Sequence, residues 1–514
     1  MCGIIGWAGD VRPELARRMQ DMLVHRGPDG EGSWHSVRGN IWLGHRRLSI
    51  IDLSDAGLQP MHSSSGRYTI VFNGEIFNFR ELRQEILAQG GQFHSHTDTE
   101  VILEAIEQWG IRATIDRLIG FFGIGLWDND LQALHLIRDR IGVKPLYFSL
   151  QGEQIGFASE MRPLLLLPWI KGEINSGALS HYFHQLCVPG HTAIINGIEK
   201  IAPGEILTFI NGKVTREIYW DLAEKSFASQ SAEHAQERFE DLLIDSVKKR
   251  LVADVPVGVF LSGGLDSSLI AAIVARHSSA KLTAYSIGFA EASHDESGHA
   301  ERAARHIGLP IKKFIVSPQT WLGQNQSLGI MHDEPFADVS SLPTFSLCQQ
   351  ARKDITVALS GDGGDEFYGG YPRYFWAQRI ENLRRMFGPM AGPVASFLQS
   401  VPPFFWDKVI HHLTAGKFTG SDGLAQRIQR LAAFIKNGPA ANTAYTESQS
   451  WISDILGSRG VDQKNQIKIP QHLSWAEGMM FADQKDYLVS DILTKVDRTR
   501  SEERRVGKEC RSRW

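Results

Sequence analysis

The sequence predicts an α+β layered domain over residues 1–205, followed by an α/β domain built on a parallel sheet over residues 206–498. Three observations support this division. The chain has 514 residues, more than one hydrophobic core usually organises. Strands alternate with helices in the second part, and this alternation is typical of a parallel sheet. Residues 257–268 join a buried strand to a helix through glycines, which is a turn that α/β sheets use at their ligand sites.

Composition and charge exclude several classes of protein. The chain is 42% hydrophobic and 22% charged, which is ordinary for a soluble globular protein. A net charge of −4 gives no reason to expect nucleic acid, and no apolar run approaches the ~18 residues of a membrane span. The four cysteines are widely spaced, so neither a disulfide framework nor a zinc site is indicated. The start lacks the pattern of a signal peptide, and we expect a cytoplasmic protein.

The first chemically suggestive residue is Cys2. Removal of Met1 would leave Cys2 with both a thiol and a free α-amino group. An α-amine has a pKa of ~7.7–8.0, so it can accept the thiol proton, as in enzymes with an N-terminal nucleophile. A cysteine at the second position is by itself more often incidental, so further segments have to support this interpretation.

Four later segments supply that support: residues 25–30 (HRGPDG), 44–51 (GHRRLSII), 71–76 (VFNGEI) and 97–100 (TDTE). Each has a structural explanation of its own. Asn73 and Gly74 suit a tight hairpin turn, and residues 97–100 suit a capping box at a helix start. In this order, however, the four segments with Cys2 resemble the glutaminase domain of class II glutamine amidotransferases.

This resemblance implies an N-terminal-nucleophile layered glutaminase domain with a defined set of roles. Cys2 would attack the side-chain amide of glutamine, and Asn73 with the N–H of Gly74 would form the oxyanion hole. Arg47 would hold the substrate carboxylate. Glu75 and Asp98 would receive its ammonium group. The glutamine-binding residues implied are Arg47, Leu48, Ser49, Ile50, Ile51, Asn73, Gly74, Glu75 and Asp98.

The second half predicts a phosphate-binding loop. A helix expected at residues 234–251 precedes the strand 257–261, the turn 262–264 and a helix that begins near Asp266. Free N–H groups at such a helix start favour bound phosphate. The pattern matches neither the Walker loop nor the dinucleotide fingerprint, and an ordinary tight turn is the alternative. It resembles the pyrophosphate loop of ATP pyrophosphatases.

Residues 355–366 (ITVALSGDGGDE) repeat this logic, because a buried strand again ends in a glycine turn with acids. Seen alone, the segment could equally be an acidic turn that faces solvent. Beside the first loop, it predicts that Asp266 and Asp365 share one Mg²⁺ on the pyrophosphate.

With residues 369–371 (GGY) added, both halves resemble the glutamine-hydrolysing asparagine synthetase family. The resemblance implies that ATP activates a carboxylate, most naturally that of aspartate, as an acyl-adenylate. Ammonia channelled from Cys2 would then form the amide, with release of AMP and pyrophosphate. Asp362 would assist the adenylation, although many relatives have glutamate there. The implied ATP-binding residues are Leu261, Ser262, Gly263, Gly264, Asp266, Ser267, Ser268, Ile287, Ser360 and Gly361.

Several alternatives remain open at this level. The acceptor could be another small carboxylate such as a sugar acid, or a carboxylate that closes a lactam, and the resemblance leaves a homodimer open. The resemblance stops after Arg498, where residues 499–514 form a charged stretch with few apolar residues. We expect a frameshift or read-through sequence there and an incomplete synthetase domain, with a surface helix or basic partner-binding tail as alternatives. A glutaminase with an inactive second half is therefore a competing function. A nucleotide-sensing module without catalysis is disfavoured by Cys2 and the paired acids.

Overall fold

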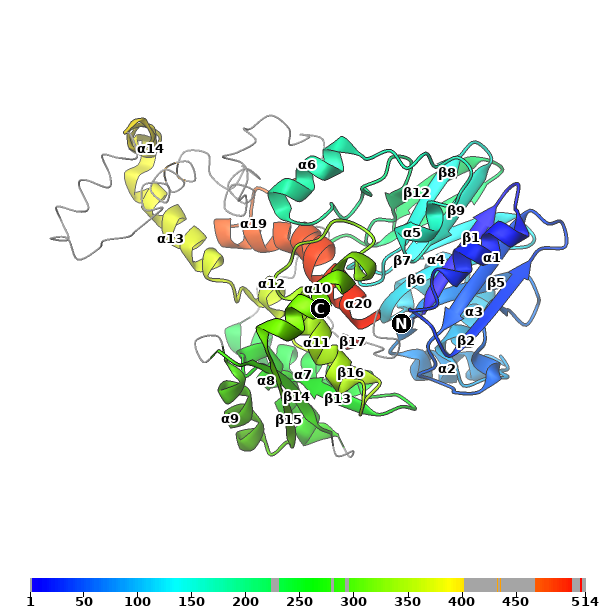
Figure 1. Cartoon of the computed structure of the whole chain (residues 1–514), viewed down its shortest axis with the longest axis horizontal. Coiled ribbons are helices and arrows are strands. Elements are labelled where there is room, and N and C mark those ends of the chain that lie inside the picture. The colour runs from blue at the N-terminus through cyan, green and yellow to red at the C-terminus, as the bar shows by residue number, and fades with distance from the viewer. Residues whose placement is uncertain are drawn as a thin grey trace.

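The computed structural model describes residues 2–222, 231–278, 282–291, 295–401, 432, 435, 467–501 and 509–510. Two bodies of the chain lie side by side, the first half on the right of Figure 1 and a parallel sheet with its helices below (Figure 1). Helices from the end of the chain lie between them. Among the described residues, the helices are too short or too polar to cross a membrane.

The first half contains two six-stranded sheets. The first has the order β10-β8-β9-β1-β3-β2, and the second has the order β12-β11-β7-β6-β5-β4. The strands of the first are β10 (Glu199–Lys200), β8 (Tyr147–Gln151), β9 (Gln154–Ala158), β1 (Gly3–Ala8), β3 (Ile41–Arg47) and β2 (Gly30–His35). Those of the second are β12 (Lys213–Ile218), β11 (Glu205–Ile210), β7 (Ala133–Arg138), β6 (Gly120–Asp128), β5 (Tyr68–Ile76) and β4 (Met61–His62). All pairings within these sheets are antiparallel.

The two sheets pack face to face, and helices cover their outer faces. Ile4 and Leu43 from one sheet meet Val71 and Leu136 from the other in a core without exposed surface. The helices of this half are α1 (Pro13–Asp21), α2 (Phe79–Ala88), α3 (Asp98–Trp109), α4 (Ile111–Arg117), α5 (Met161–Leu164) and α6 (Ser176–Gln185). The result is the layered α+β fold that the sequence predicts.

The second sheet continues beyond residue 205. Because β11 pairs with both β7 and β12, the hairpin at residues 205–218 belongs to this sheet. The boundary expected at residue 205 therefore falls within the sheet. The Pro203-Gly204 and Asn211-Gly212 pairs mark turns before and within the hairpin, and Gly204 and Gly212 both have positive φ.

The second half is built on a five-stranded parallel sheet with the order β15-β14-β13-β16-β17. Its strands are β13 (Val257–Phe260), β14 (Ala284–Phe289), β15 (Ile311–Val316), β16 (Val357–Leu359) and β17 (Glu509–Cys510). The helices around it are α7 (Ala232–Arg250), α8 (Leu265–His277), α9 (Ser297–Ile307), α10 (Pro318–Met331) and α11 (Ser341–Ala351). The prediction of an α/β parallel sheet is confirmed, and the loops after β13 and β16 meet at one edge because these two strands are neighbours.

The last elements connect the two halves. After α12 (Gly364–Tyr368), α13 (Pro372–Phe387), the short helix η3 (Gly388–Met390) and α14 (Ala391–Ser400), the chain returns through α19 (Trp475–Ala482). It continues as the π-helical segment η5 (Asp483–Ile492) and ends this run in α20 (Leu493–Ser501). In Figure 1, α19 and α20 lie between the first half and the parallel sheet.

Candidate active sites in the two halves

Cys2 lies immediately before β1, and the chain after β3 holds its side chain. The N–H of Leu48 donates to the Cys2 sulfur over 3.5 Å, and the thiol lies 3.8 Å from the Leu48 carbonyl oxygen. The neighbouring β1 and β3 are paired from Gly3 to Ala8, which fixes this approach. The sulfur is therefore placed by backbone atoms and not by a mobile side chain.

The electrostatics of the pocket favour the thiolate of Cys2. Burial raises the pKa of the thiol, but the buried imidazole of His45 and the N–H of Leu48 lower it by more. The balance brings the pKa of Cys2 from 9.0 to about 6. A thiolate is the nucleophilic form of cysteine, so this environment suits covalent catalysis near neutral pH.

A cavity with an empty volume of about 540 Å³ opens beside Cys2. It is lined by Cys2, Arg47, Leu48, Ile50, Ile51, Gly57, Gln59, Phe72, Asn73, Gly74, Thr97, Asp98, Thr99, Phe121 and Lys144. The structure thus brings together Cys2 and most of the residues expected to bind glutamine. Ser49 and Glu75 are next to lining residues in the sequence but do not themselves line the cavity.

Asn73 is the polar group best suited to an oxyanion in this cavity. Its side chain is 1% exposed, and its amide nitrogen has no hydrogen-bond partner among the described residues. A buried donor without a partner is costly, which indicates that a ligand satisfies it. Asn73 and Gly74 lie within the continuous strand β5, so the alternative of a hairpin turn is wrong.

Arg47 and Asp98 both line the cavity, and each is held by backbone contacts. Arg47 donates to the carbonyl oxygens of Ser54, over 2.7 Å, and of Asp52. Asp98 begins α3 and accepts from the N–H of Ile76 over 3.0 Å. A cation and an anion are therefore both positioned to face the charged ends of a free amino acid.

The candidate nucleotide site lies at the carboxyl ends of β13 and β16. Residues 262–264 form the predicted glycine turn, in which Gly263 has a φ of +83°, and α8 begins at Leu265. The hydroxyl groups of Ser262 and Ser267 form a hydrogen bond of 2.9 Å. Leu261 is buried, and its N–H donates to the Tyr285 carbonyl oxygen of the neighbouring strand.

The second loop packs directly against the first. A side chain at Gly361 would lie 2.9 Å from the backbone nitrogen of Ser267, and one at Gly364 would lie 2.7 Å from the Asp266 carboxyl carbon. Glycine is thus required where the two loops meet. Ser360 donates to the Asp362 carboxylate over 2.8 Å at the start of this loop. Ile287 is half-buried in β14, beside β13.

Three acids converge at this junction. Burial and the nearby Asp365 raise the pKa of Asp266, and burial and Asp362 raise the pKa of Asp365, which Arg373 partly offsets. Burial and neighbouring like charges both favour the protonated form of a carboxyl. Within the described ranges, no group of three or more His, Cys, Asp or Glu side chains is arranged to hold a metal ion by itself.

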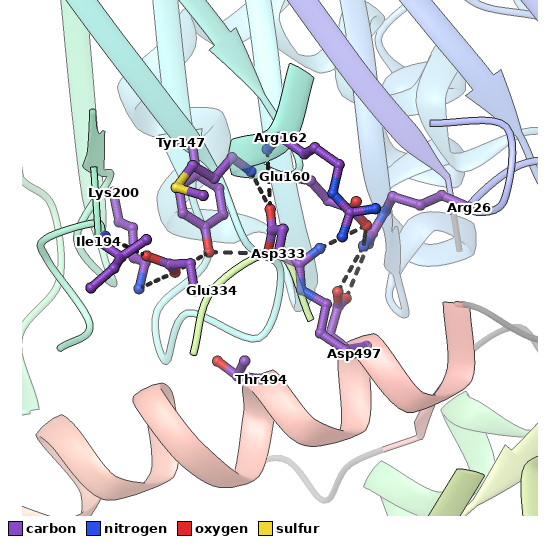
Figure 2. A network of polar contacts seen from close by, with 12 residues as sticks. Arg26, Tyr147, Glu160, Arg162, Ile194, Lys200, Asp333, Glu334, Thr494 and Asp497 are labelled. Carbon is purple, nitrogen blue, oxygen red and sulfur yellow. Dashed lines mark hydrogen bonds and ion pairs between the residues drawn. The ribbon is translucent and has the colours of Figure 1, made fainter. Parts of the chain in front are cut away.

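The sequence reasoning assigned no role to a polar cluster that the structure reveals between the two sites. Arg26, Glu160, Asp333, Asp497 and Arg498 form a buried ionic network across the two halves (Figure 2). Arg26 lies in the segment 25–30 of the family resemblance, and Asp497 and Arg498 lie at the point where that resemblance stops. Their pairing was not predictable, because it joins residues up to 471 positions apart.

Comparisons with known proteins agree with this geometry. Residues 1–220 match a family model described as a glutamine amidotransferase domain, and residues 238–504 match one described as asparagine synthase. Two proteins of Bacillus subtilis (strain 168) named asparagine synthetase [glutamine-hydrolyzing] 1 and 3 are 35% and 36% identical over 382 and 403 residues. Each alignment covers 73% of this chain, but only 59% and 64% of the relatives.

A protein of Methanocaldococcus jannaschii, whose name also places it among the glutamine-hydrolysing asparagine synthetases, is 32% identical over 410 residues. That alignment covers 75% of this chain and 78% of the relative. The chain therefore spans less than two thirds of the first two relatives and more than two thirds of the third. From the matched models, the aligned relatives and the two sites, we conclude that this chain belongs to the asparagine synthase family.

Proposed function

We propose that this protein uses glutamine and ATP to convert a carboxylate into an amide, with aspartate as the acceptor and asparagine as the product. The observation that carries the proposal is the cavity beside Cys2, where a thiol with a pKa of about 6 lies with an unpartnered Asn73 amide. The names of the relatives support the choice of aspartate. We place the glutaminase domain at residues 1–220 and the synthetase domain from residue 238 onward, where the two family models match.

In the first reaction, the Cys2 thiolate would attack the side-chain amide carbon of glutamine. Asn73 and the N–H of Gly74 would stabilise the negative oxygen, while Arg47 and Asp98 would hold the two charged ends of the substrate. Collapse of the intermediate would release ammonia and leave a thioester on Cys2. Water would then hydrolyse the thioester to glutamate and regenerate the thiol.

In the second reaction, the acceptor carboxylate would attack the α-phosphorus of ATP and expel pyrophosphate. The loops at residues 262–268 and 360–365 would bind the phosphates through backbone N–H groups. Leu261 and Ile287 would contact the nucleotide, and Asp362 would assist adenylation. Ammonia would then displace AMP from the acyl-adenylate. Because ammonia is mostly protonated in bulk water, an internal path from Cys2 is expected.

Asp266 and Asp365 would hold a Mg²⁺ ion in this site. Burial and the nearby Asp365 raise the pKa of Asp266, and burial raises that of Asp365 although Arg373 partly offsets it. Two carboxyls this close to each other and to the loops are suited to share a divalent ion. Such an ion would neutralise charge on the pyrophosphate. Phosphate oxygens and water would complete its coordination. We place the enzyme in the cytoplasm, since Cys2 has to remain a free thiol.

The proposal is tested with glutamine, aspartate and MgATP, by measuring glutamate, asparagine and pyrophosphate in the same reaction. We expect asparagine and pyrophosphate in equal amounts. The Cys2→Ala variant should lose the glutamine-dependent reaction but form asparagine when ammonium is supplied. Glutamate without pyrophosphate would contradict aspartate as the acceptor, and a panel of other carboxylates would then be screened. No glutamate at all would contradict the role of Cys2.

A further inference from the structure

The helix α20 carries a carboxylate that is bound from the glutaminase half. Asp497 accepts two hydrogen bonds from the Arg26 guanidinium, over 2.9 and 3.1 Å, and lies 3.7 Å from the Lys144 ammonium. All three side chains are at most 3% exposed. Figure 2 shows Asp497 on the helix below and Arg26 reaching it from the other half.

Both cations that bind Asp497 also belong to the surroundings of Cys2. Arg26 donates from its Nε atom to the backbone carbonyl oxygen of Cys2 over 3.1 Å. Lys144 lines the cavity into which Cys2 faces. Two independent contacts therefore run from one carboxylate of α20 to the nucleophile and to the wall of its pocket.

The same helix is anchored in the synthetase half by the neighbouring residues. Arg498 pairs with Asp333 over 2.9 Å, and also with Glu160, which is itself bound by Arg26. Lys495 pairs with Asp338 over 2.9 Å and donates to the Ser340 hydroxyl over 2.8 Å. Asp333, Asp338 and Ser340 thus anchor α20 in the synthetase half, while Glu160 and the partners of Asp497 bind it from the glutaminase half.

A buried ionic cluster usually adds little net stability to a fold. Desolvation of the charges costs about as much as their attraction returns, so apolar residues of similar volume would often hold an interface equally well. Ion pairs in fixed bidentate geometry do, however, define position and orientation. Here the cluster places three cations, Arg26, Lys144 and Arg498, against the carboxylates of Glu160, Asp333 and Asp497.

From this geometry we propose that Asp497 is a positioning residue of the glutaminase site, acting through Arg26 on the backbone of Cys2. The seating of α20 in the synthetase half then controls the geometry of the nucleophile. This inference rests on the proposed function in one respect, namely that Cys2 is the nucleophile. Asp497 is 2% exposed and does not line the cavity, so it acts on the reaction only through its two cations.

The test compares two substitutions that each remove one buried carboxylate from the same interface. Asp497→Asn keeps the side-chain shape but weakens the hold on Arg26. Glu334→Gln is the matched control, because the side chain of Glu334 is only 10% exposed and also bridges the halves, but it contacts Tyr147, Ile194 and Lys200 instead. Three quantities are measured: kcat and KM for glutamate release, the rate of iodoacetamide labelling at Cys2 mapped by peptide, and amide formation with ammonium.

For Asp497→Asn we expect kcat for glutamate release to fall on the order of tenfold to a hundredfold, as displaced catalytic groups commonly cause, with KM little changed. The pH midpoint of Cys2 labelling should shift, and ammonium-dependent synthesis should persist. Glu334→Gln should stay within about twofold of the parent in glutamate release, because it leaves the geometry around Cys2 intact. Equal losses in both variants would show a loosened interface only and would overturn the proposal.

If the Asp497→Asn variant does not fold, the Arg26→Lys variant provides the test instead. Lysine retains a charge for Asp497 and Glu160 but cannot reproduce the fixed fork that also reaches the Cys2 carbonyl oxygen. We expect the same loss of kcat, and full glutaminase activity in Arg26→Lys would overturn the inference. Labelling of Cys2 needs no substrate. If the parent protein formed no glutamate, the proposed function would fail, while unequal labelling of the variants would still support the positioning role.

Discussion

At the scale of single residues, the lowered pKa of Cys2 depends on neighbours that the chain supplies from β3 and the loop after it. Burial disfavours the thiolate, so an isolated buried cysteine would be inert. His45 lies on β3 opposite Ile4, and Leu48 follows the same strand. Such neighbours lower the pKa of the thiol by more than burial raises it, so the pKa of Cys2 is about 6.

The first prediction concerns the pH dependence of Cys2. Only the thiolate reacts with iodoacetamide, so labelling should rise with pH, with a midpoint near 6, and reach a plateau above about pH 7. In His45→Gln the lowering influence of the imidazole is lost, and the midpoint should move to higher pH. Peptide mapping of the label against pH measures both. A midpoint near 9 in the parent protein would contradict the role given to the pocket.

At the scale of elements, the site in the second half depends on two loops that touch at glycines. The loops follow adjacent parallel strands, so their carboxyl ends meet at one edge of the sheet. A side chain at Gly361 would collide with the backbone nitrogen of Ser267, and one at Gly364 would displace the Asp266 carboxylate. The geometry of the acids therefore depends on backbone approach between the loops.

The second prediction is that Gly364→Ala impairs only the second half. The added methyl group would lie 2.7 Å from the Asp266 carboxyl carbon and push that carboxylate away from Asp365. Pyrophosphate release should fall severalfold or more, whereas glutamate release without ATP should not change. Gly323→Ala is the control, since no atom lies within 4 Å of its added methyl group and alanine favours the helix α10. Equal pyrophosphate release in both variants would contradict the packing argument.

The third prediction concerns η5, where Asp491 is buried beside Asp338. Burial and this like charge raise the pKa of Asp491 to about 8, against ~3.9 for an aspartate in an unfolded chain. The folded state thus holds a proton that unfolding releases. Its stabilising effect is complete below about pH 4 and is lost as pH rises through about 8.

Asp491→Asn should remove this dependence, because the amide mimics the protonated acid. The variant should gain stability relative to the parent at pH 8 and much less at pH 5. Urea unfolding at the two pH values measures the difference. If the parent and the variant lost stability in parallel as the pH rose, Asp491 would not hold the proton assigned to it.

At the scale of the whole molecule, local sequence patterns predicted much of the fold. They did not predict which residues pair across the two halves. Short-range spacing predicts the strand at 257–261, the helix at 234–251 and the glycine turns, and the structure has all of them. The α/β sheet was predicted for the same reason, whereas the layered α+β domain was implied by the family resemblance. In contrast, the predicted domain boundary separated the hairpin at 205–218 from the sheet to which it belongs. The Pro203-Gly204 pair suggests the end of a domain, and only the pairing of β11 with β7 shows that the sheet continues.

The residues of the candidate sites also divide into those that sequence patterns predicted and those that they did not. Cys2, Asn73 and Asp98 were predicted from segments of the family pattern, and they meet at one cavity. Arg26 was noted only as part of the segment 25–30, and Asp497 was given no role. Their pairing depends on how two separately folded bodies dock, and no periodicity within either body encodes that arrangement.

The last prediction concerns the joint stability of the halves. Arg498 pairs with Asp333 and Glu160, and its side chain is 2% exposed. Arg498→Met would leave both carboxylates buried with one cation fewer, which commonly costs about 3–5 kcal/mol. Calorimetry should show a lower Tm, with the two halves beginning to unfold separately. Arg112→Met is the control, because Arg112 pairs with Asp116 and Glu217 at the surface, where a pair contributes about 0–1 kcal/mol.

Acid should act on the same cluster in a defined direction. Arg26 and Lys144 overcome the effect of burial and hold the pKa of Asp497 at about 2, and Arg498 and His25 likewise hold the pKa of Glu160 well below its ordinary value. The stability from these lowered pKa values is present above about pH 4 and is lost as pH falls toward 2. The parent should therefore keep one cooperative transition at pH 5. Arg498→Met should already show two transitions at that pH, since its carboxylates no longer have enough cations to stay ionised in the interface. A single unshifted transition in Arg498→Met would show that the halves are held together without the network.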